Sequence, residues 1–258
     1  MFVFRFLRLV LRDVFSQSCL HQFLLEFVGT ALFLSASLST LLIRGDKRST
    51  VCPLQVVLVF GLSVSMAALS VGGAVHLNPA VSLAMALTLR LRLWRAVLYM
   101  VGQLLGGVAS ALSFPSDSTA CVQVSSGVRL HQAFTVEALI TLQLVLVVMV
   151  TAEVPLPVGA TPLLVGLTVS LGHLVAVGAT GCGMNPARSF GPAAVTLNFK
   201  DHWVFWAGPI LGACVAALLN DLLLRPVCLN LQEEPVVFSG PTGSLFGFSI
   251  DFHPVNNT

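Results

Sequence analysis

The chain has 258 residues, of which 56% are hydrophobic and only 9% are charged, with a formal net charge of +2. Soluble domains carry about 25% charged residues, so this chain has too little polar surface to face water on all sides. The composition favours a protein embedded in a lipid bilayer. No basic patch stands out in the sequence, which gives no support to a nucleic-acid partner.

Residues 1–19 are expected to form an interfacial segment ahead of the first span. Arg5, Arg8 and Arg12 interrupt the N-terminal apolar run, so it lacks the continuous apolar core of a signal peptide. Their spacing places the three arginines on one helical face, which is typical of a helix lying at the membrane surface. A disordered leader is the alternative interpretation.

Six stretches then have the length and apolarity of a transmembrane helix, which needs about 20 residues. These stretches are 20–43, 52–71, 94–114, 132–152, 162–180 and 202–224. Two further apolar pieces are too short to cross, and each lies beside an Asn-Pro-Ala triplet; they are 76–89 and 183–197. The remaining residues, 226–258, show little periodicity and are interpreted as a flexible cytoplasmic tail.

Basic residues between the spans suggest an orientation. Seven fall on the side of the N-terminus: Arg5, Arg8, Arg12, Arg90, Arg92, Arg95 and Arg225. Five fall on the other side: Arg44, Lys47, Arg48, Arg129 and Lys200. Because positive charge concentrates in cytoplasmic loops, this small excess favours cytoplasmic termini.

The second half of the chain repeats the landmarks of the first. Asn78-Pro79-Ala80 recurs as Asn185-Pro186-Ala187, 107 positions later, and the pentapeptide at 61–65 recurs at 166–170 with an offset of 105. Each repeat, about 20–115 and about 131–225, therefore holds three spans and one short segment. Because three is odd, the second repeat enters the membrane from the opposite side. The sequence predicts an all-α membrane protein with six transmembrane helices and two re-entrant half-helices in an inverted repeat.

Each triplet has the chemistry of a helix start. Asn at the cap position accepts a backbone N–H, and Pro is favoured at the first helical position. Backbone at membrane depth is tolerated outside a helix only where it is buried in protein or lines a wet cavity. Two half-helix N-termini meeting near the midplane would place partial positive charge and amide donors around a path for neutral polar molecules.

The two triplets, the stretches HLNPAV and GCGMNPARSFGPA, and the Glu-Phe-x-Gly-Thr of the first span resemble the aquaporin family (major intrinsic proteins). The resemblance covers about residues 20–225. It implies a passive water channel that excludes protons and ions, with water as permeant and no cofactor. It also implies a homotetramer with one pore in each subunit, which we expect in the plasma membrane.

The resemblance further implies a selectivity filter formed by four residues: Phe60, His173, Cys182 and Arg188. A charge at the centre of a spanning helix costs about 2.5–3.5 kcal/mol, so a filter role explains why an arginine stands in an apolar tract; bracing of the loop is the alternative. We expect Cys182 to expose its sulfur at the exterior mouth, with a buried, inert cysteine as the alternative. Ser189, after the arginine, resembles the water-selective branch, since the glycerol-conducting branch typically has Asp there.

Two carboxylates and a histidine complete the expected site. Glu26 and Glu137 match family glutamates that accept hydrogen bonds from the re-entrant loops; the alternative is a glutamate near the membrane boundary. His76 matches a histidine of the cytoplasmic vestibule, where gating by protonation is a hypothesis. The loop before Asn78 is about two residues shorter than the family pattern, so a channel of low permeability is an alternative interpretation.

Other functions need features that the sequence lacks or only partly supplies. An alternating-access transporter needs a coupling carboxylate, and Glu26 and Glu137 are the candidates. A glycerol-type channel for small neutral solutes and a structural membrane protein with a poor pore remain alternatives. No nucleophile–base pair or metal-ligand spacing supports an enzyme.

Overall fold

The computed structural model describes residues 2–42, 53–114 and 122–224, and every regular element within these ranges is helical. The first repeat contains α2 (Gln17–Leu42), α3 (Pro53–Ser70), α4 (Pro79–Leu87) and α5 (Leu93–Leu112), preceded by α1 (Phe2–Val14). The second contains α6 (Leu130–Thr151), α7 (Ala160–Thr180), α8 (Pro186–Thr196) and α9 (Val204–Leu219), which the π-helical turn η2 (Asn220–Leu224) extends.

The predicted all-helical membrane fold is confirmed. Within the described ranges, five helices are long and apolar enough to cross a membrane, and they correspond to α2, α5, α6, α7 and α9 with η2. The remaining expected span, 52–71, corresponds to α3, whose apolar part at 54–70 is shorter. The tail expected at 226–258 lies outside the described residues.

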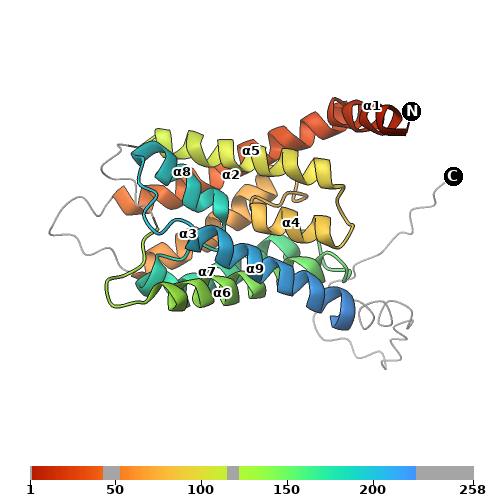
Figure 1. Ribbon diagram of the computed structural model, residues 1–258. Helices are drawn as coiled ribbons and strands as arrows, with labels where there is room; N and C mark the ends of the chain where they lie inside the picture. The colour runs from red at the N-terminus through yellow and green to blue at the C-terminus, as the bar shows by residue number, and fades with distance from the viewer. Residues whose placement is uncertain (1, 43–52, 115–121, 225–258) are drawn as a thin grey trace, which may run out of the picture.

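The helices of the two repeats pair in the same way. α2 packs against α5, α6 packs against α9, and α3 of the first repeat packs against α7 of the second. Both α2 and α5 begin at one end of the bundle, where α9 also ends; we refer to this end as the terminal face (Figure 1). The half-helices α4 and α8 lie in opposite halves of the bundle's length (Figure 1).

The half-helix α8 crosses from its own repeat to pack against α5. The two backbones approach closely, since a Cβ atom added at Gly191 would lie 2.3 Å from the carbonyl oxygen of Gly107. The corresponding half-helix α4 packs against α9 as well as α5. Each half-helix is therefore held by the final span of the other repeat.

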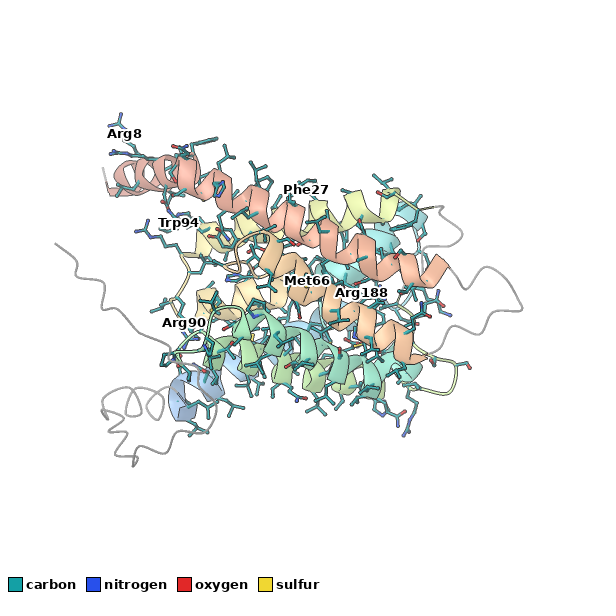
Figure 2. All side chains as sticks on the ribbon, turned by 180° about the vertical axis from the view of Figure 1, so that it is seen from behind. Arg8, Phe27, Met66, Arg90, Trp94 and Arg188 are labelled. Carbon is teal, nitrogen blue, oxygen red and sulfur yellow. The ribbon has the colours of Figure 1, made fainter. Side chains whose placement is uncertain are left out.

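At the terminal face, Arg90 connects three elements just after the end of α4. Its guanidinium forms an ion pair with Glu153, beyond the end of α6, and lies 3.6 Å from a carboxylate oxygen of Asp221 in η2. Figure 2 shows Arg90 at this end of the bundle, whereas Arg188 lies well inside it. The two arginines thus act at different depths.

The centre of the bundle depends on a close crossing of α3 and α7. A Cβ atom on Gly61 would lie 1.9 Å from Ser170 Oγ and 2.5 Å from the carbonyl oxygen of Gly166. Ser65 Oγ donates to the carbonyl of Pro162 at 3.0 Å, which adds a hydrogen bond between the helices. Small residues at a membrane helix crossing allow this approach.

Gly61→Ala should therefore destabilise the folded protein, although alanine has the higher helix propensity. Because the backbone of Gly166 blocks the new methyl group, we expect a cost of roughly 1–3 kcal/mol, as in other overpacked sites. Thermal unfolding of the purified protein in detergent measures the effect. Gly178→Ala is the matched control, since a Cβ there meets nothing within 4 Å. Equal stability of the two variants would contradict the tight crossing.

Candidate functional site

The two triplets begin the two half-helices in the same manner. Asn78 precedes Pro79, the first residue of α4, and its Oδ1 accepts the N–H of Ala80 at 2.9 Å. In the second repeat, Asn185 Oδ1 accepts the N–H of Ala187 at 2.9 Å. Each asparagine oxygen is thereby committed to capping its own helix, which leaves the amide nitrogen for another partner.

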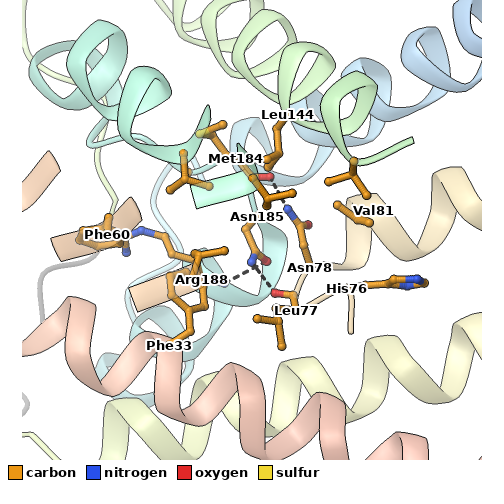
Figure 3. Close-up of a pocket in the computed structure, with 15 residues that line it drawn as sticks. Phe33, Phe60, His76, Leu77, Asn78, Val81, Leu144, Met184, Asn185 and Arg188 are labelled. Atoms are coloured by element: carbon orange, nitrogen blue, oxygen red, sulfur yellow. Dashed lines mark hydrogen bonds between the residues drawn. The ribbon is translucent and has the colours of Figure 1, made fainter. Parts of the chain in front are cut away.

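The amide nitrogens join the two loops reciprocally. Asn78 Nδ2 donates to the carbonyl of Met184 at 2.9 Å, and Asn185 Nδ2 donates to the carbonyl of Leu77 at 2.7 Å. Both bonds are drawn in Figure 3, where the two asparagines lie side by side. A side-chain amide carries two N–H groups, so one donor of each asparagine remains for the cavity that both residues line.

A buried carboxylate holds the loop of the first repeat. Glu26 Oε1 accepts the backbone N–H of His76 at 2.7 Å, and its Oε2 accepts that of Leu77 at 2.8 Å. Gln103 Nε2 adds a third hydrogen bond to Oε2 at 2.8 Å. The glutamate has no exposed surface, so these donors replace the water that a carboxylate otherwise requires.

The second repeat uses Glu137 in the same way. The backbone N–H groups of Gly183 and Met184 donate to its two oxygens at 2.9 and 2.8 Å. Thr180 Oγ1 supplies the third bond at 2.5 Å. Gly183 permits this approach, because a Cβ there would lie 2.9 Å from a carboxylate oxygen of Glu137.

These bonds hold backbone that would otherwise relax. Leu77, Cys182 and Met184 all adopt left-handed conformations, with φ between 55° and 57°. Such conformations in non-glycine residues cost of order 1–3 kcal/mol each and persist where the surroundings determine them. The glutamates and asparagines provide those surroundings.

His76 lies at the end of the cavity away from Phe60 (Figure 3). Its Nδ1 lies 3.0 Å from Ser82 Oγ, and that hydroxyl accepts a hydrogen bond from Gln103 Nε2 at 2.9 Å. The serine hydroxyl thus links His76 to Gln103, and the direction of its bond to Nδ1 depends on the tautomer of the ring.

Three of the four expected filter residues are in contact. The rings of Phe60 and His173 have centroids 4.3 Å apart, and the guanidinium carbon of Arg188 lies 5.2 Å from the Phe60 ring centroid. His173 Nδ1 lies 2.9 Å from the carbonyl of Val169, which only accepts, so Nδ1 carries the proton. In the neutral ring, Nε2 is then an acceptor, and it is buried without a protein hydrogen-bond partner within the described ranges.

Cys182 does not lie as expected. The sequence leads to an exposed sulfur at the exterior mouth, but Cys182 has no exposed surface and packs in the core cluster that contains Met184. Its N–H donates to Thr180 Oγ1 at 3.2 Å, which directs the chain at this left-handed residue. The position of Cys182 therefore agrees with the alternative interpretation, a buried cysteine.

The cavity between the loops is narrow and mixed in character. Its volume is about 40 Å³, enough for only a few waters, since one needs about 10–15 Å³. Polar lining comes from Asn78, Asn185, Arg188 and His76, and the rest of the wall is largely apolar, including Phe33, Val64, Leu144 and Val169.

Sequence reasoning missed two kinds of residue in this site. Gln103, Thr180 and Ser82 hold the anchoring groups. Only Gln103 had a signal in the sequence, because it lies between Gly102 and Gly106, which recur 106 positions later as Gly208 and Gly212. Phe33 and Leu144 line the cavity from ordinary apolar spans. No motif distinguishes such positions from lipid-facing ones.

This architecture defines a class of protein. Spanning helices in an inverted repeat enclose two half-helices whose N-termini meet at a buried, partly polar cavity, which is the construction of a membrane channel. The family described as major intrinsic protein matches residues 13–220. The chain belongs to this family, the aquaporin channels, and is an integral multi-pass membrane protein.

Curated relatives and a solved structure agree with this assignment. The chain is 38% identical to aquaporin-1 of Sus scrofa over 250 residues, which cover 90% of this chain and 92% of that protein. It is 36% identical to aquaporin-1 of Homo sapiens, with coverage of 90% and 91%. An aquaglyceroporin structure from Plasmodium falciparum superposes with a TM-score of 0.73 at 23% identity, covering 82% of this chain and 99% of that one. This last likeness shows the fold alone.

Replacing Glu137 with Gln should destabilise the protein more than the same change at Glu153. Glutamine keeps one acceptor but turns an NH₂ group toward a backbone donor, and hydrogen bonds to charged groups contribute about 1.5–3 kcal/mol. Glu153→Gln is the matched control just beyond the end of the same helix, where its partner Arg90 keeps a second carboxylate, that of Asp221, at 3.6 Å. Thermal unfolding in detergent compares them. A larger loss at Glu153 would contradict the anchoring role of Glu137.

Proposed function

We propose that the protein is a passive water channel that excludes protons and other ions. The observation that carries this proposal is the reciprocal pair of amide bonds, Asn78 Nδ2 to Met184 and Asn185 Nδ2 to Leu77, at 2.9 and 2.7 Å. Because each asparagine uses one N–H in these bonds, its second N–H remains for the cavity. Two fixed donors at one depth suit the oxygen of a water molecule.

Exclusion of protons follows from the direction of these donors. A water that accepts hydrogen bonds from both asparagines has its lone pairs occupied, so it does not accept a proton from a neighbouring water. The N-termini of α4 and α8 add partial positive charge at the same place, which repels cations. Arg188, within the proposed filter, adds a full charge, and such elements are the recognised barrier to protons and cations in this kind of pore.

The proposed filter combines donors with one acceptor. Arg188 is 4% exposed and lines the cavity, while His173 Nε2 offers a lone pair in the neutral ring. A small molecule that both donates and accepts hydrogen bonds can replace those it loses to bulk water with bonds to these groups. An ion replaces its hydration shell less well. Since the Phe60 and His173 rings touch, passage must run beside the guanidinium. Because the side chain of Cys182 is buried, only its backbone could contribute to the filter.

Glycerol or a similar small neutral solute is the second candidate permeant. The apolar lining that Phe33, Val64 and Leu144 add around the asparagines suits a molecule with a C–H backbone and hydroxyl groups. Ser189, which is buried and donates to the carbonyl of Asn185 at 3.2 Å, favours water, because the glycerol-conducting branch typically has Asp there.

The wider setting is part of the same proposal. A homotetramer with one pore per subunit in the plasma membrane, and a cytoplasmic terminal face, fits the family. The cluster Arg90, Arg92 and Arg95 at the terminal face supports that orientation through the excess of positive charge on cytoplasmic loops.

Proteoliposomes containing the protein should swell faster than empty vesicles in stopped-flow measurements, without proton leakage. Arg188→Val should increase proton or solute leakage, because the full positive charge at the filter is removed. Arg129→Val is the control, since Arg129 is exposed at the start of α6. Swelling equal to that of empty vesicles, with correctly folded protein, would overturn the proposal.

Phe60→Ala should raise glycerol permeability relative to water permeability. Removing the ring opens the space between His173 and Arg188, so a solute wider than water can pass. Phe134→Ala is the matched control, because that ring stacks on Trp203, with centroids 6.0 Å apart, and does not line the cavity. If the native protein already conducts glycerol as well as it conducts water, the second candidate replaces the first.

A further inference from the structure

The helix α1 is attached to the bundle through one carboxylate. Asp13 Oδ2 accepts hydrogen bonds from Trp94 Nε1 at 2.7 Å, Arg95 Nε at 2.9 Å and Arg92 Nη1 at 3.2 Å. The hydrogen bonds from Arg95, followed by that from Trp94, hold the pKa of Asp13 well below its usual value of 3.8. A depressed carboxyl pKa keeps the contribution of this clamp intact above that usual value, and acid removes it only at lower pH.

The clamp also fixes the depth of α1 in the membrane. Trp94 lies in the first turn of α5, and tryptophan gathers at the interface between hydrocarbon and water. The guanidinium of Arg92 lies 5.7 Å from the Trp94 ring centroid. Figure 1 shows α1 lying outside the bundle beyond the terminal face. The C-terminal end of α1 is therefore held at the level of lipid headgroups.

The exposed surface of α1 combines positive charge with large apolar side chains. Arg8 and Arg12 are exposed and stand four residues apart, so they share one helical face. Figure 2 shows Arg8 directed away from the bundle. Beside them, Leu7, Leu11 and Phe15 form a stripe at the same spacing, with exposed fractions of 51%, 47% and 79%.

The charges of Arg8 and Arg12 are not neutralised by α1 itself. Asp13 is the one acidic residue of that helix, and the clamp directs it toward α5. The side chain of Arg92 is 62% exposed despite its bond to Asp13. Arg92 is already paired with Asp13, so Arg8 and Arg12 are the guanidinium groups that stand beside the apolar stripe, an arrangement that matches the phosphate and acyl parts of an anionic lipid.

We infer that α1 forms a binding surface for anionic lipid headgroups, defined by Arg8 and Arg12 and positioned by Asp13. The occupant is a lipid in the leaflet at the terminal face. The guanidinium groups bind its phosphate, and Leu7, Leu11 and Phe15 contact its acyl chains. The surface lies away from the cavity, so it is distinct from the proposed permeation path.

Native mass spectrometry of the full chain, released from nanodiscs of equal phosphatidylserine and phosphatidylcholine, tests this inference. We expect the native protein to retain phosphatidylserine in preference to phosphatidylcholine. The double variant Arg8→Gln/Arg12→Gln should lower that preference by up to roughly fivefold for each arginine removed. The control Arg129→Gln/Lys200→Gln removes two exposed charges at the opposite end and should leave it nearly unchanged. An equal loss in both double variants would overturn a localised site.

The variant Asp13→Asn separates a built surface from simple summation of charge. Summation predicts a stronger preference for phosphatidylserine, because a negative charge disappears. The inferred site predicts a weaker one, since α1 is no longer held against the start of α5 at the level of the lipid headgroups. Circular dichroism and gel filtration establish that the variant is folded. A preference that rises in Asp13→Asn would overturn the positioning role of this residue.

Discussion

The structure depends on two buried carboxylates that satisfy backbone donors at membrane depth. Re-entrant loops leave N–H groups outside any helix, and lipid offers no water to bind them. Glu26 and Glu137 each accept two such groups and one side-chain donor, and neither has exposed surface. Without them, the left-handed turns before each triplet would lose the hydrogen bonds to their backbone N–H groups and keep only those of the asparagines. The asparagine contacts, and hence the cavity, follow from that anchoring.

The two repeats reach the same geometry by different side chains. Gln103 supports Glu26 in the first repeat, whereas the matching position in the second is Pro209, and Thr180 supports Glu137 instead. The amide of Gln103 also orients Ser82, and through it His76. The first loop is therefore joined to a longer polar chain than the second. This asymmetry places the histidine-bearing network on the terminal side alone.

The sequence predicts the framework well because membrane insertion makes strong demands. Span length, the paired triplets and their equal offsets identify the helices and the half-helices, since apolar length and cap chemistry are local properties. Cys182 shows where this reasoning ends: its motif is unmistakable, but the direction of its side chain depends on a left-handed backbone and on Thr180. Phe33 and Leu144 line the cavity without any signal, because a pore-facing apolar residue looks like a lipid-facing one.

The exchange of half-helices between repeats has a consequence for biosynthesis. α8 lies against α5 with Gly191 and Gly107 almost touching through their backbones, although 84 positions separate these glycines in the chain. When α5 leaves the ribosome, the element that covers it has not been made. The nascent first half must therefore wait in the bilayer with an uncovered glycine surface. Contacts between segments so far apart in the chain form late in folding. Mutations at Gly107 or Gly191 would therefore first expose the protein to the quality-control machinery of the cell.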